Sequence, residues 1–96
     1  MNLRLNFGRA LRAARKLRKV PQEALDNVSS RTYISSLERG LKSPTLDKIN
    51  QIAEELNVHP LTLLAFGVLG RKSADEFDEV MRKIKLEYEL LLMEDN

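Results

Sequence analysis

Between Ser30 and Ser43 the chain concentrates side chains that can form hydrogen bonds with nucleic acid. If residues 31–39 form a helix, the helical repeat groups several polar residues on its outward side. These outward residues are Arg31, Thr32, Ser35, Ser36 and Arg39. Arginine can donate two hydrogen bonds to guanine, and short hydroxyl side chains let a helix approach base edges in the major groove of DNA. Each residue alone would be ordinary surface, but their cluster near a helix start favours a base-reading function.

Residues that commonly carry catalysis or bind metals are scarce. The chain has no cysteine and one histidine, His59, which precedes Pro60 and is expected at a helix start. This set cannot form a usual zinc site or a thiol nucleophile. Adjacent acids such as Glu54 and Glu55 diverge on a helix and do not converge on one substrate. We therefore expect no catalytic residue, no metal and no cofactor, and interpret the chain as a binding protein and not an enzyme.

Charge is distributed unevenly along the 96 residues. Residues 1–72 carry 13 basic and 6 acidic side chains, whereas residues 73–96 carry 3 basic and 8 acidic ones. A basic surface attracts DNA because binding releases condensed counterions. Basic helices can also be merely solvated surfaces, so charge alone leaves both interpretations open. If DNA is the partner, the acidic end should point away from it.

The spacing of apolar residues predicts an all-α protein without strands. Capping residues, prolines and glycines mark the expected helix ends. The expected helices span residues 5–18, 22–27, 31–39, 45–57 and 59–66, and a long final helix follows Ser73. In the third helix we expect Ile34, Leu37 and Leu41 to be buried. In the fifth, the inward-facing residues should be Leu61, Leu64 and Ala65.

The final helix carries an apolar seam at heptad spacing. Its members are Phe77, Met81, Ile84, Tyr88 and Leu91, widened by Val80. Two heptads are too few for a stable coiled coil alone. The seam could pair with its copy in a dimer or fold back on the first and fifth helices.

Residues 7–66 together resemble the lambda-repressor/Cro-like helix-turn-helix family, also called the Xre family. The matching positions are Gly8, Leu11, Ala14, Arg15, Gln22, Leu25, the run from Ser30 to Gly40, the run from Ser43 to Leu46, Ile49, Ile52, Ala53, Leu56 and Val58. The resemblance implies a five-helix DNA-binding domain that places residues 31–39 in the major groove. It further implies a transcription regulator.

The resemblance also implies individual roles. Base contacts would come from Arg31, Thr32 and Ser36, with Ser35 close enough to share them. Contacts with phosphates would come from Gln22, Ser30, Tyr33, Arg39, Lys42 and Ser43. For Tyr33, packing on the core and contact with a thymine methyl remain alternatives. Arg15 and Glu38 match a structural salt bridge between the first and third helices.

Three departures from the family pattern affect the second helix and its turn. The interval from Gln22 to Arg31 is two residues shorter than in most members, and Asp26 replaces the usual small alanine. Pro21 stands where a serine or threonine cap is common. These departures leave open the geometry of the second helix and its turn, and with it the assignment of Gln22.

The expected organisation is a DNA-binding domain at 1–66, a linker at 67–72 and a dimerisation helix at 73–96. Because the family's head closes its own core, the appended helix needs another surface, and a twofold copy is the commonest one. The predicted function is a cytoplasmic, homodimeric regulator that binds an inverted repeat in double-stranded DNA, a repressor or autoregulator, without a membrane segment. The alternative is an antitoxin-like or adaptor module whose final helix binds a protein partner.

Overall fold

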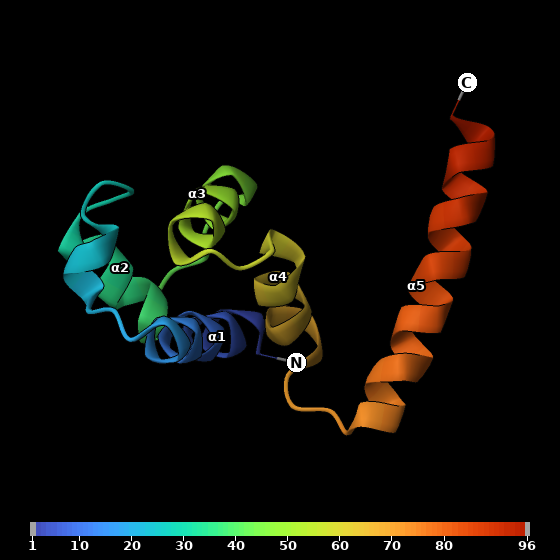
Figure 1. Cartoon of the computed structure of the whole chain (residues 1–96), viewed down its shortest axis with the longest axis horizontal. Coiled ribbons are helices and arrows are strands. Elements are labelled where there is room, and N and C mark those ends of the chain that lie inside the picture. Colours follow the sequence, from blue (N-terminus) through green and yellow to red (C-terminus); the bar gives the residue numbers. More distant parts are fainter. Residues whose placement is uncertain (1, 96) are drawn as a thin grey trace.

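The computed structural model describes residues 2–95, and all regular secondary structure within them is helical (Figure 1). The elements are α1 (Leu3–Arg18), the 3-10 helix η1 (Gln22–Leu25), α2 (Arg31–Glu38), α3 (Leu46–Leu56), α4 (Pro60–Leu69) and α5 (Ala74–Glu94). The all-α prediction is confirmed. Helices α1 to α4 gather with η1 into a compact head, while α5 stands apart from them.

Side-chain caps set most of the helix starts. The hydroxyls of Ser30 and Thr45 accept from backbone N–H groups three residues on, as the sequence predicts. Ser73 and Glu76 form the predicted capping box of α5. The side chain of Asn2 accepts from the backbone of Leu5, so α1 begins two residues earlier than expected. Each cap satisfies N–H groups that a helix terminus would otherwise leave unpaired.

The second element is shorter than predicted. It is a single 3-10 turn that ends at Leu25, and not an α-helix that reaches Asn27. Pro21, which precedes this turn, has an extended backbone and offers no side-chain cap. Short 3-10 segments are common as connectors between α-helices. Leu25 is fully buried and fixes this turn on the core.

The core of the head is apolar and draws on α1 to α4 and η1. Its fully buried large side chains are Leu11, Leu25, Ile34, Leu37, Ile52, Leu56 and Leu63. Leu41, predicted to be buried, is 57% exposed. The reason is that α2 ends at Glu38 and Gly40 adopts φ +74°, which turns the following residue off the helix face.

Helix α4 also departs from the prediction. Leu61, expected to face inward, is 64% exposed, and Leu63 takes the buried position. The helix continues through Gly67 to Leu69, so the connection to α5 is shorter than the expected linker at 67–72. Gly67 is buried against α1, close to Phe7. Gly70, with φ +66°, ends the helix, and the left-handed region favours glycine.

Helix α5 has no fully buried residue, and the alternative in which it folds onto the head is not what the structure shows (Figure 1). Within residues 2–95, no single helix combines the length and apolar character that crossing a membrane requires. Helices α3 and α4 pass that test only as a pair, which is bent by 118°.

Candidate nucleic-acid interface

Helix α2 lies very close to α1. A Cβ atom at Gly8 would lie 2.5 Å from the carbonyl oxygen of Leu37 and 2.6 Å from that of Glu38. Such distances leave no room for a side chain, so glycine is required there. Ile34 and Leu37 are fully buried on the same side of α2. The orientation of α2 is therefore fixed by its packing on α1.

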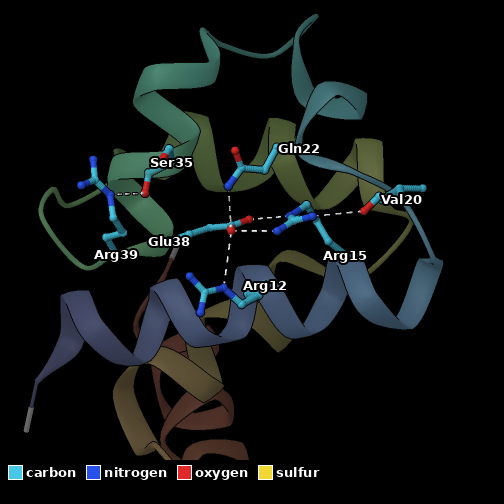
Figure 2. A network of polar contacts seen from close by, with 7 residues as sticks. All are labelled: Arg12, Arg15, Val20, Gln22, Ser35, Glu38 and Arg39. Atoms are coloured by element: carbon cyan, nitrogen blue, oxygen red, sulfur yellow. Dashed lines mark hydrogen bonds and ion pairs between the residues drawn. The ribbon is translucent and has the colours of Figure 1, made fainter.

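A buried carboxylate ties three elements together beneath α2 (Figure 2). Glu38 accepts two hydrogen bonds from the guanidinium of Arg15, at 2.5 and 2.8 Å. It also accepts one from the side-chain amide of Gln22, at 3.0 Å. Arg15 donates in addition to the carbonyl of Val20, at 3.2 Å. The predicted salt bridge between Arg15 and Glu38 is confirmed, and it joins α1, η1 and α2.

This network changes the acidity of both partners. Burial disfavours the charged form of Glu38, but hydrogen bonds from Arg15 and Gln22 outweigh it and lower the pKa of the carboxyl. The hydrogen bond with Glu38 likewise raises the pKa of Arg15. The side chain of Glu38 is 1% exposed. It is a structural brace, since its oxygens already have partners and it is shielded from a ligand.

The outward side of α2 borders a shallow polar depression. Its lining residues are Gln22, Arg31, Thr32, Ser35 and Arg39. Four of them come from α2 or its C-terminal cap and one from η1. Arginine and hydroxyl side chains on one accessible helix face can donate to base edges and phosphates.

Ser36 does not belong to this outward side. The sequence interpretation placed it there, but it is buried, at 7% exposure. The last turn of α2 packs on α1, and Leu37 and Glu38 beside it are buried too. In an eight-residue helix, this close packing leaves a narrower outward face than the periodicity suggests.

The remaining predicted site residues lie near the start of α2 or after its end. The hydroxyl of Ser30 caps the helix. Tyr33 is partly buried and packs against the core, with the ammonium of Lys42 at 5.7 Å from its ring centroid. Ser43 accepts a hydrogen bond from Arg4 at 3.0 Å. Tyr33 thus has a structural role in addition to any contact with DNA.

Two acidic residues next to Arg31 were not among the predicted site residues. Glu23 and Asp26 lie 3.5 and 3.9 Å from its guanidinium. Asp26 is one of the departures from the family pattern. That both acids lie beside Arg31 depends on the 3-10 geometry of η1, which the sequence did not predict.

Lys48 is a further positioning residue that sequence reasoning missed. Its ammonium donates to the carbonyl of Val28 at 2.5 Å and to the side chain of Gln51 at 3.4 Å. This contact joins α3 to the turn that precedes α2. No motif marks such a contact, because it depends on how α3 crosses the turn.

Comparison with known proteins agrees with this geometry. The helix-turn-helix family profile matches residues 11–63, which include η1, α2 and α3. The chain therefore belongs to the Xre-type helix-turn-helix family of DNA-binding transcription regulators, a family of regulators and not of enzymes.

Within this class, the chain is similar to control protein C.BamHI of Bacillus amyloliquefaciens. The two are 40% identical over 72 residues, which cover 72% of this chain and 89% of the relative. No solved structure shows a significant match to the chain.

Proposed function

We propose that this regulator binds DNA as a homodimer and reads an inverted repeat, with α2 of each subunit in a major groove. The observation that carries the proposal is the accessible polar face of α2 on a helix fixed by Gly8 and Glu38. A rigid support is needed because base-edge hydrogen bonds require accurate placement. Occupying an operator in this way would make the protein a repressor or autoregulator.

The proposed contacts fall into two groups. Arg31, Thr32 and Ser35 would contact bases. The groups for phosphates are Ser30, Tyr33, Arg39, Lys42 and Ser43. Gln22 already donates to Glu38, but its amide has a second N–H group that can still reach a phosphate. Ser36 is left out because it is buried.

The dimer proposal rests on the apolar surface that α5 leaves open. Its seam includes Phe77, Ile84, Tyr88 and Leu91, which are 40%, 48%, 60% and 69% exposed, and the partly buried Val80 and Met81. An open apolar groove runs between α4 and α5, lined among others by Leu64, Val68 and Phe77. Soluble monomers rarely leave large continuous apolar patches exposed. The proposed occupant is α5 of a second copy, because the exposed seam has heptad spacing and can pair with itself.

A twofold dimer determines what the DNA site must look like. Two recognition helices of this class enter successive major grooves about 34–36 Å apart, so the half-sites form an inverted repeat. The acidic α5 would project away from the phosphates. The name of the relative, a control protein, agrees with a regulatory function of this kind.

Arg31→Ala tests the base-reading role. We expect binding to the specific site to weaken by about 1–3 kcal/mol per half-site, with relaxed preference at one base pair, because a bidentate contact with guanine is lost. Binding of selected and singly substituted duplexes, followed by fluorescence anisotropy, measures both effects. An equal loss on specific and random DNA would refute base reading by this residue.

Lys42→Ala tests a proposed phosphate contact, in contrast to the base contact that Arg31→Ala tests. Since a phosphate contact carries no sequence information, we expect uniform weakening on all duplexes and a salt dependence flatter by about one unit of slope per subunit. Titrations at several salt concentrations measure that slope. If it stays unchanged, Lys42 does not contact a phosphate.

A further inference from the structure

Arg31 faces two carboxylates on the DNA side of the head. One guanidinium nitrogen lies 3.5 Å from Glu23 and 3.9 Å from Asp26, both on or next to η1. The side chains are 58%, 51% and 53% exposed, in the order Arg31, Glu23, Asp26. All three lie near the depression that we propose to face DNA, which Arg31 itself lines.

Such an arrangement works against indiscriminate DNA binding. Carboxylates at a DNA-facing surface repel phosphates. They also pair with the guanidinium of Arg31, which would otherwise pair with the nearest phosphate. Exposed ion pairs are weak and exchange readily. The two ion pairs therefore favour one position of the Arg31 side chain but do not fix it. A stronger hydrogen-bond acceptor can displace the carboxylates.

We propose that Glu23 and Asp26 are specificity-determining residues that keep Arg31 from pairing with the phosphates of arbitrary DNA. The inference rests on the proposed base-reading role of Arg31. A guanine edge is neutral and offers two acceptors that the guanidinium matches. A phosphate, which is present on every sequence, is an anion that the two carboxylates repel. The carboxylates thus weaken nonspecific binding more than specific binding.

The position of the acids follows from the shortened η1. Asp26 is the C-terminal cap of this 3-10 turn, and Glu23 lies in its first turn. Arg31 begins α2 after a short connection. Gln22, the other polar residue of η1 near this site, is held by Glu38. The two acids are therefore the groups of η1 that can act on Arg31.

The test is the double variant Glu23→Gln with Asp26→Asn, which retains size and removes both charges. Its binding is measured to an operator selected by the wild-type protein and to a random duplex of the same length. We expect random-duplex binding to tighten about tenfold and operator binding by less than about threefold, since each removed charge ceases to repel phosphates and Arg31 is released. The salt slope on random DNA should steepen by about one unit per subunit as Arg31 gains a phosphate.

Two controls separate this effect from net charge and from structure. Glu54→Gln with Glu55→Gln removes the same charge from exposed positions of α3 and should change both affinities by the same factor. Glu23→Asp with Asp26→Glu keeps both charges and should keep the ratio of the two affinities. Circular dichroism checks that each variant is folded.

The outcomes distinguish a failure of this inference from a failure of the proposed sequence-specific DNA binding. If the wild type binds one duplex selectively but the neutral double variant keeps the same ratio, the inference is wrong and the function stands. If the wild type shows no preference among duplexes, the proposed function fails and the inference with it.

Discussion

Ile84→Asp should yield a folded monomer that binds the operator at least 100-fold more weakly. Ile84 is 48% exposed in the single chain, so an aspartate there remains hydrated until a partner helix covers it. In the proposed dimer the carboxylate would be buried without a partner, which is strongly unfavourable. Separated subunits lose the roughly 100-fold or greater gain that comes from linking two binding sites.

Light scattering or sedimentation measures the mass, circular dichroism the helix content, and anisotropy the binding. Leu86→Asp is the matched control: it introduces the same group at an exposed apolar position of α5 outside the seam. We expect this control to remain dimeric and to bind DNA. If the Ile84→Asp protein stays dimeric, the seam is not the dimer interface. If it unfolds, the seam belongs to the core of the single chain.

Glu38→Gln should lower the free energy of unfolding by about 3–5 kcal/mol, as for other broken buried ion pairs. Glutamine keeps the shape but loses the charge that balances Arg15, whose guanidinium donates to both carboxylate oxygens. Urea denaturation measures the change, with Glu54→Gln, at an exposed position of α3, as the control. Undiminished stability would show that the network is not a brace.

The same residue predicts a pH dependence. The pKa of Glu38 is lowered in the folded state, so its contribution to stability is fully present above the pKa that this carboxyl has in the unfolded chain. The contribution is lost as the pH falls through the lower folded-state value. Wild-type stability should therefore decrease in acid more steeply than that of Glu38→Gln. Parallel pH profiles for the two proteins would contradict this assignment.

The head could be predicted largely from local signals. Ser30, Thr45 and Ser73 cap their helices as their residue types indicate. The apolar stripe of α3 is buried from Ile49 to Leu56, whereas Leu46 at the start of the helix is 74% exposed. The link between Arg15 and Glu38 came from the family resemblance. The helix caps and the apolar stripe depend on short-range patterns, and the ion pair on a long resemblance to the family. Both kinds of signal can be read from a single sequence.

The predictions that the structure contradicts failed because tertiary contacts decide these features. Gly67 stays helical because it packs against α1, although glycine usually favours a helix end. Ser36 is buried because α1 covers the last turn of α2. Glu23 and Asp26 were not recognised beside Arg31, since η1 forms a 3-10 turn there. None of these contacts leaves a periodic signal in the sequence.

The most direct test of the central claim is selection of bound duplexes from a random library at near-physiological salt. A dimer that reads DNA through α2 should enrich an inverted repeat whose half-sites are centred about 34–36 Å apart, close to one helical turn. Failure of the folded protein to enrich any sequence, or enrichment of a single asymmetric half-site, would contradict the account. A folded protein with no DNA preference would instead favour an interaction module whose α5 binds another protein.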